Sequence, residues 1–306
     1  MIIINKSKIA TISFINFGNA KQNKASEISI NLKKINNSFE KCYYSPENSH
    51  LKIIHLILTR FLVEFSRKDT FIKNIYNDSY ILNGIRVLKK YLLPSLENQS
   101  CKQFIWTLLL GDKINITYIK QLIIYNSSFE LNVIYNKDLK YYVKNKTKDF
   151  DILISTRIDY DDRIYYDAVN DVRKVININK PMFLYGYNRG VMYFESEDKY
   201  YYYYFVSVNN KGVLGIFASL ITVLNKVNDT YTIMDLGSHS KIRMKILESY
   251  KSFGIKDLKY EPAIFESGEI KYVYVRHKYS KDYKRSIKIK NKLIQCNFNL
   301  TKFYGK

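Results

Sequence analysis

The chain has 306 residues, of which 46% are hydrophobic and 25% are charged, so it can bury a full core and is too apolar to be mostly disordered. Its 11 glycines, 4 prolines and 3 widely spaced cysteines exclude collagen-like and proline-rich architectures and indicate no disulfide framework. The formal net charge of +21 attracts anions, but it does not choose among nucleic acid, acidic lipid and phosphorylated substrates.

The cysteine count favours a reducing, cytoplasmic setting, and hydropathy predicts no membrane span. The longest apolar stretch, residues 212–224, is shorter than the roughly 18 residues that cross a bilayer, and the first residues lack the pattern of a signal peptide. We expect an N-terminal extension at 1–50, partly ordered at best, one domain at 51–281 and a basic tail at 282–306. Residues 276–306 carry ten Lys or Arg and one acid, so a solvated tail and peripheral contact with an anionic membrane are both open interpretations.

From residue 51 onward, short apolar runs alternate with segments of helical periodicity, which is typical of an α/β fold with a mainly parallel central sheet flanked by helices. Strands of that sheet are expected at 53–61, 104–110, 130–135 and 151–156. Helices are expected at 80–99, with a kink or restart at Pro94, and at 118–125, 163–176 and 213–224. In the later half, strands at 182–187, 191–195, 201–208 and 271–275 predict a small antiparallel second sheet.

Five consecutive tyrosines, Tyr200 to Tyr204, lie within one of the later strands. We favour a strand that carries amphipathic rings on both faces, and the alternative is a platform on which nucleic-acid bases stack.

Polar residues follow three of the expected strands, as Thr59-Arg60, Gly111-Asp112 and the segment 157–162. Ligands of open α/β sheets bind beyond the carboxyl ends of the strands, so these residues should meet at one edge. Arg60 and Arg157 suit a phosphate group, and a salt bridge to a neighbouring acid is the alternative. Asp112 either accepts hydrogen bonds from a ribose or base, or is a turn residue.

The segment Asp159-Tyr160-Asp161-Asp162 places three carboxylates within four residues, where they repel one another unless a cation neutralises them. Hard divalent ions prefer oxygen ligands, and an extended Asp-x-Asp pair presents both carboxylates on one side. A solvated helix N-cap with extra acids is the alternative. His277 follows an expected strand and could complete a metal site.

Four motifs occur in order along the chain. They are Arg60-Phe61, Arg86 followed by Leu92-Leu93-Pro94-Ser95-Leu96 and Gln99, Phe104-Ile105-Trp106 before Gly111-Asp112, and Thr156-Arg157-Ile158-Asp159-Tyr160-Asp161-Asp162. Taken together, they resemble the rhamnosyltransferase family of bacterial glycosyltransferases, which has a GT-A-type fold. The resemblance covers roughly residues 51–281, which it makes a GT-A-like glycosyltransferase domain, and gives the N-terminal extension no counterpart.

The resemblance implies transfer of a sugar, rhamnose by the family's name, from a nucleotide-sugar donor to a hydroxyl of a glycan, glycolipid or protein acceptor in surface polysaccharide or glycoconjugate synthesis. It implies Mg²⁺ or Mn²⁺ held by Asp159 and Asp161, with His277 as a further ligand and His239 as the competing match. The residues that it places against the donor are Arg60, Phe61, Arg86, Asp112 and Arg157.

Sugar transfer also needs a base for the acceptor hydroxyl. Asp162 is the nearest acid to the predicted metal pair, and the alternatives are Glu195, Glu197, Asp198 and Asp235. Two other classes stay open: an inactive nucleotide-binding module of the same fold, and a basic nucleic-acid-binding protein. We disfavour the second and expect no nucleic-acid partner, because the basic residues are spread along the chain and the acidic segment repels a polyanion.

Overall fold

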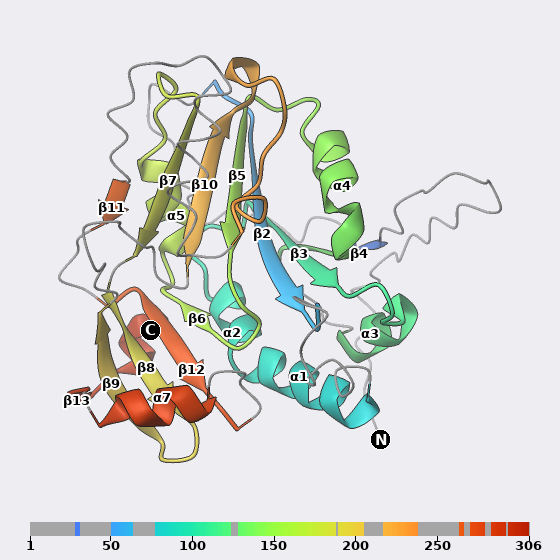
Figure 1. The fold of residues 1–306 in the computed structure, drawn as a ribbon. Helices are drawn as coiled ribbons and strands as arrows, with labels where there is room; N and C mark the ends of the chain where they lie inside the picture. The colour runs from blue at the N-terminus through green and yellow to red at the C-terminus, as the bar shows by residue number, and fades with distance from the viewer. Residues whose placement is uncertain are drawn as a thin grey trace, which may run out of the picture.

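The computed structural model describes residues 28–30, 50–63, 77–123, 128–187, 189–204, 217–237, 263–265, 270–278, 283–291 and 293–305. They form a helix-flanked sheet with a second, smaller sheet beside it (Figure 1).

The first sheet has the strand order β1-β4-β3-β2-β5-β10-β7-β11. The strands are β1 (Ile28–Ile30), β2 (Ile53–Phe61), β3 (Ile105–Leu110), β4 (Glu130–Tyr135), β5 (Ile152–Arg157), β7 (Met182–Tyr187), β10 (Ala218–Val223) and β11 (Ala263–Phe265). Strands β4, β3, β2 and β5 run parallel, while β10 lies antiparallel between β5 and β7. At the edges, β1 pairs antiparallel with β4 and β11 pairs parallel with β7. The expected α/β class with a mainly parallel central sheet is confirmed.

Helices cover both faces of this sheet. They are α1 (Asp78–Lys90), α2 (Leu92–Glu97), α3 (Ile116–Ile123), α4 (Leu139–Lys146) and α5 (Ala168–Lys174). Because successive side chains of a strand point to opposite faces, Ile57 of β2 packs in the cluster with α1, α2, α3 and α5, while Leu56 and Leu58 pack in the cluster with α4. This burial on both faces explains why the strands appear in the sequence as continuous apolar runs.

The second sheet has the order β13-β9-β8-β12-β6. Its strands are β6 (Arg163–Ile164), β8 (Arg189–Phe194), β9 (Lys199–Tyr204), β12 (Tyr272–Arg276) and β13 (Gln295–Cys296). The sheet is mixed, because β12 runs parallel to β8 whereas the other pairs are antiparallel. The tyrosine run forms β9, as expected, and its rings pack on both sides of the strand: Tyr200 lies 5.0 Å from Phe298, and Tyr203 lies 5.8 Å from Tyr274, between ring centroids.

The long helix expected at 80–99 is two helices. Asn77 caps α1 by accepting a hydrogen bond from the Ser79 N–H, and the break falls at Tyr91. Pro94 is the third residue of α2, within the first turn, where its missing N–H costs no helical hydrogen bond. The expected restart of the helix near Pro94 is therefore confirmed.

Two other helical predictions are wrong. Residues 218–223, expected within a helix, form the central strand β10, and residues 163–164, expected to start a helix, form β6. A short apolar run does not separate a buried helix from a buried strand, and the β-branched residues 221–223 favour the strand. The strand at 182–187 also joins the first sheet, not the second.

The expected C-terminal tail is packed against the second sheet. It contains α7 (Tyr283–Lys290), the paired strand β13 and α8 (Leu300–Phe303), and the Phe303 side chain is buried. The cysteine expectation also needs correction, because Cys101 is disulfide-bonded while Cys296 is free. Within the described stretches, every helix is too short or too polar to cross a bilayer.

A buried polar chain crosses the middle of the first sheet. His55 Nε2 is hydrogen-bonded to Thr156 Oγ1 at 2.7 Å, and that hydroxyl lies 2.7 Å from Ser219 Oγ. Burial, followed by the positive charge of Arg173, lowers the pKa of His55 well below that of a free histidine. The fold therefore holds His55 neutral.

Acid should destabilise the fold through His55. Its folded pKa is lowered, so the stability of the neutral form is present above about pH 6.5, the pKa of an unfolded histidine, and is lost as the pH falls below that value, by up to about 1.4 kcal/mol per pH unit. Urea unfolding from pH 7.5 to 5 should show this slope, and His55→Gln should reduce it. The matched control His50→Gln, at an exposed position, should keep it. Equal slopes in the two variants would contradict the assignment.

Candidate functional site

The site lies where the strand order of the first sheet reverses. After β2 the chain adds β3 and β4 on one side, and it then returns to place β5 on the other side of β2. Such a switch point leaves a crevice beyond the carboxyl ends of the two central strands. Arg60 lies near that end of β2, and Arg157 is the last residue of β5.

The two arginines and one aspartate form a charged cluster at this edge. Arg157 Nη2 lies 3.3 Å from Asp159 Oδ1, and Arg157 Nη1 donates to the Gly237 carbonyl at 3.5 Å. Burial and the neighbouring positive charge of Arg157 lower the pKa of Arg60 to about 10, against the opposing effect of Asp159. Two guanidinium groups held this close together form an environment that favours an anion.

The acidic segment turns sharply between the two sheets. The Asp162 N–H donates to the Asp159 carbonyl at 3.2 Å, so the segment forms a turn and not the extended backbone expected. Asp161 Oδ2 lies 3.2 Å from Nε2 of His277, whose side chain is fully buried just after β12. The turn therefore brings an aspartate that follows a strand of the first sheet against a histidine that follows a strand of the second.

The third carboxylate of the segment, Asp162, is completely buried. Its Oδ1 accepts a hydrogen bond from the Val275 N–H at 3.1 Å, while Oδ2 has no hydrogen-bond partner. Burial first, and then the negative charges of Asp161 and Asp159, raise its pKa well above the usual value, against the opposing charge of Arg276. This geometry ties the turn to β12 and favours a structural role, while its role as a base stays a prediction.

The predicted metal ligands are partly assembled. Asp161 and His277 are adjacent, but Asp159 faces Arg157, and within the described ranges no group of three or more His, Cys, Asp or Glu side chains is placed to hold a metal ion. His239, the competing match, lies outside the described residues. Two carboxylates and an imidazole are nevertheless a donor set suited to Mn²⁺ or Mg²⁺.

Three residues assigned to the donor take other positions. Phe61 is buried and contacts the Tyr160 ring edge-on, with the centroids 5.3 Å apart. Arg86 is half exposed on α1, and its Nη1 lies 3.7 Å from Glu195 Oε1. Asp112 is exposed after β3, with its Oδ2 3.8 Å from Lys137 Nζ. Their roles in binding stay predictions.

The other candidate bases are held by local contacts. Glu195 accepts from Tyr91 Oη at 2.6 Å and from Lys90 Nζ at 2.9 Å. These bonds outweigh the effect of burial and lower the pKa of Glu195. The remaining contacts are those of Glu197 with Lys290, of Asp198 with the Tyr193 hydroxyl, and of Asp235 with the Thr232 N–H.

Sequence reasoning missed two tyrosines beside the acidic turn. Tyr160 within the turn and Tyr80 on α1 are hydrogen-bonded to each other through their hydroxyls. Burial and the charge of Asp161 raise the pKa of Tyr80 to about 12, which places this hydroxyl near the predicted metal ligands. Tyr160 is part of the acidic segment 159–162. Tyr80 lies far from that segment in the sequence, and only the fold brings the two tyrosines together.

The comparisons with known proteins give only distant likenesses. No protein-family model and no curated protein sequence matches the chain. The chain is similar to the structure of S. aureus TarS 1-349, with 13% identity and a TM-score of 0.38 over 72% of this chain and 60% of that one. It is also similar to a cytidylyltransferase from Leptospira borgpetersenii serovar Hardjo-bovis, with 14% identity and a TM-score of 0.37 over 79% and 88% of the two chains.

A second structure of S. aureus TarS has 11% identity and a TM-score of 0.32, and the match covers 74% of this chain and 37% of that one. This chain thus spans about 60% of the length of TarS 1-349. The TM-scores of these three structures all lie below 0.5, so the likenesses are distant.

Gly111 lets the ends of β2 and β3 approach each other at the edge of the site. A Cβ at this position would lie 2.6 Å from the backbone oxygen of Leu62. Leu62 itself has a φ of 55°, a left-handed conformation that is unfavourable for a branched side chain. The close approach of the backbone at Leu62, just after Arg60-Phe61, therefore depends on a residue without a side chain at 111.

Gly111→Ala should destabilise the protein by about 1–3 kcal/mol, because a backbone atom cannot rotate out of the way as a side chain can. The neighbouring variant Asp112→Ala, at an exposed position, should change stability by no more than about 0.5 kcal/mol. Urea midpoints at an unchanged m-value measure both effects. Equal midpoints for the two variants would show that the strand ends are not packed this closely.

Proposed function

We propose that this chain is a glycosyltransferase that depends on a divalent metal ion and uses a nucleotide-sugar donor. The observation that carries the proposal is the meeting of Arg60, Arg157, Asp159, Asp161 and His277 at the switch point of the first sheet. Cations and metal-binding acids side by side suit a diphosphate, which needs both a counterion and hydrogen-bond donors.

Asp159, Asp161 and His277 would hold Mg²⁺ or Mn²⁺. The ion would neutralise the negative charge that develops on the diphosphate leaving group. In the structure described here Asp159 is paired with Arg157, so the proposal requires Asp159 to exchange that partner for the ion. The incoming diphosphate would in turn accept hydrogen bonds from the released Arg157.

The arginines would act directly on the donor. Their guanidinium groups donate to phosphate oxygens, and this contact is strongest when the bond between the anomeric carbon and the diphosphate oxygen breaks, because the electron pair then stays on the diphosphate. The acceptor hydroxyl oxygen forms the new bond to the anomeric carbon, and its proton passes to a carboxylate base. Asp162 stays the predicted base on sequence grounds, although its complete burial favours the structural role described above.

The finer parts of the proposal follow from the resemblance described above. They are rhamnose as the sugar, a glycan, glycolipid or protein as the acceptor, and a role in surface polysaccharide or glycoconjugate synthesis. Donor choice depends on small changes in a pocket, so the family name is weaker support for rhamnose than the site is for a nucleotide sugar.

A nucleotide-binding module without transfer activity is the second candidate. The ion pair between Arg157 and Asp159 supports it, because an aspartate that stays neutralised by an arginine is not available to a metal ion. The two candidates differ in whether nucleotide binding requires a divalent ion.

Thermal unfolding of the full chain with UDP, GDP, CDP and dTDP, each with and without Mn²⁺, distinguishes them. We expect one diphosphate to raise the midpoint by several degrees only when Mn²⁺ is present, because a ligand at about 100 times its Kd stabilises the fold by about 2.7 kcal/mol. Asp161→Asn and His277→Gln should remove this shift, whereas Asp149→Asn, at an exposed turn, should keep it.

A shift of the same size without metal, retained in Asp161→Asn, would support the binding module. No shift with any diphosphate would reject both candidates. Sugar transfer is then measured as the release of diphosphate from nucleotide sugars. The rate of the wild-type chain is compared with that of Asp159→Asn.

A further inference from the structure

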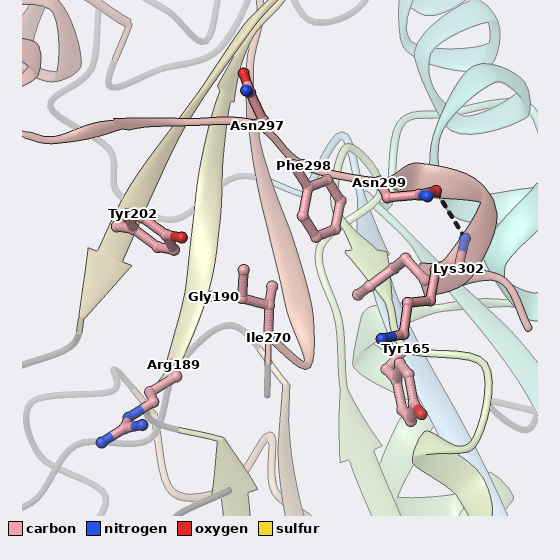
Figure 2. Close-up of a pocket in the computed structure, with 10 residues that line it drawn as sticks. Tyr165, Arg189, Gly190, Tyr202, Ile270, Asn297, Phe298, Asn299 and Lys302 are labelled. Atoms are coloured by element: carbon pink, nitrogen blue, oxygen red, sulfur yellow. Dashed lines mark hydrogen bonds between the residues drawn. The ribbon is translucent and has the colours of Figure 1, made fainter. Parts of the chain in front are cut away.

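The second sheet carries a groove whose lining residues are not those of the charged cluster. Two cavities of about 370 and 350 Å³ share Asn297, Phe298 and Asn299, and together we call them the distal groove. Figure 2 shows the first cavity, where Phe298 stands between Tyr202 of β9 and Lys302 of α8. Arg189 and Ile270 also line this cavity.

The groove exists because the C-terminal segment folds back on the second sheet. Strand β13 pairs with β9, and the chain then passes through residues 297–299 into α8. Phe303 is buried and anchors this segment, with its ring centroid 5.9 Å from that of Tyr165 and 5.4 Å from that of Phe298. The groove is therefore built on a packed aromatic support.

The chemistry of the groove is typical of sites for small polar ligands that have an apolar face. Tyr202 is 38% exposed, and with Phe298 it offers aromatic surface. The exposed amides of Asn297 and Asn299 supply hydrogen-bond donors and acceptors that match sugar hydroxyls. Rings combined with amides fit a saccharide, which has both C–H faces and hydroxyl edges.

The charges of the groove favour an acidic saccharide. Lys302 and Arg189 line the first cavity, and Figure 2 shows the Arg189 guanidinium pointing away from the other lining residues. Asp198, the acid of the second cavity, accepts a hydrogen bond from the Tyr193 hydroxyl at 2.8 Å. The net charge of +21 adds a long-range attraction for anions.

The extent of the groove suits an oligosaccharide. Ile270 lies about seven residues of extended chain, roughly 23 Å, from His277, whereas Tyr165, which also lines the first cavity, is three residues after Asp162 and so at most about 11 Å from the end of the acidic turn. An oligosaccharide can therefore follow the two joined cavities while its end approaches the donor.

We propose that the distal groove binds an acidic oligosaccharide and so selects the acceptor. The acceptor role rests on the proposed function, whereas saccharide binding itself does not. Single-stranded nucleic acid is less well matched, because successive bases need a row of exposed rings. Of the tyrosine run, Tyr201 is buried, while Tyr200 and Tyr203 pack against other rings.

Direct binding to the full chain, without nucleotide, tests the proposal. The probes are tetragalacturonic acid, maltotetraose as its neutral counterpart, and an eight-nucleotide oligothymidylate, each titrated by calorimetry. We expect tetragalacturonic acid to bind at least about tenfold more tightly than maltotetraose at low salt, and less so at 0.5 M salt, because screening weakens the contact with Lys302.

Two variants locate the binding. Tyr202→Ala should weaken tetragalacturonic acid about tenfold by removing aromatic surface, and Lys302→Met should remove most of the preference for the acidic probe while keeping a similar side-chain length. The matched control Lys288→Met, an exposed lysine on α7, should change neither value. Unchanged thermal midpoints confirm that the variants are folded.

Equal binding of the two tetrasaccharides, equal effects of Lys302→Met and Lys288→Met, or tighter binding of the oligothymidylate would overturn the proposal. Thermal shifts with nucleotides and Mn²⁺, measured on the same variants, separate saccharide binding in the distal groove from the proposed donor site. Saccharide binding without any nucleotide shift supports the groove and rejects the proposed donor site, whereas a nucleotide shift without saccharide binding does the reverse.

Discussion

Three carboxylates crowded into residues 159–162 form the constraint on which both sheets depend. Each is accommodated in its own way: Asp159 by the guanidinium of Arg157, Asp161 by contact with His277, and the buried Asp162 by a hydrogen bond from the β12 backbone and the nearby charge of Arg276. Because two of these contacts lead to β12 or the residue after it, the same turn that ends β5 holds the second sheet in place. The contacts that offset the repulsion between these like charges thus also connect the two sheets.

This arrangement also explains why a charged site can form at the switch point. The parallel strands β2 and β5 deliver Arg60 and Arg157 to the same edge, and the turn that follows β5 supplies the acids. A cation and an anion that enter together could exchange partners with Arg157 and Asp159 and leave the net charge of the cluster unchanged. His277 and Asp162 are both buried, and their contacts hold the turn in position.

The C-terminal segment builds the distal groove on the second sheet. Its basic composition resembled a solvated tail, yet Phe303 and the pairing of β13 with β9 make it part of the core. The segment thereby converts one face of β9 into the distal groove, and the alternation of side chains along the strand leaves Tyr202 exposed there while Tyr201 is buried on the other side.

The sequence alone predicted the strands β2, β4 and β7 to the residue, because short apolar runs bounded by polar residues are typical of strands in a sheet covered on both faces. It also placed Arg60, Arg157 and the acidic segment at strand ends, whereas the turn within that segment was not predicted. Only the tertiary structure decided that residues 218–223 form a strand, that Tyr80 lies near Asp161, and that Phe61 and Asp162 are buried. These features arise from contacts between segments distant in the chain, and local periodicity does not encode which segments meet.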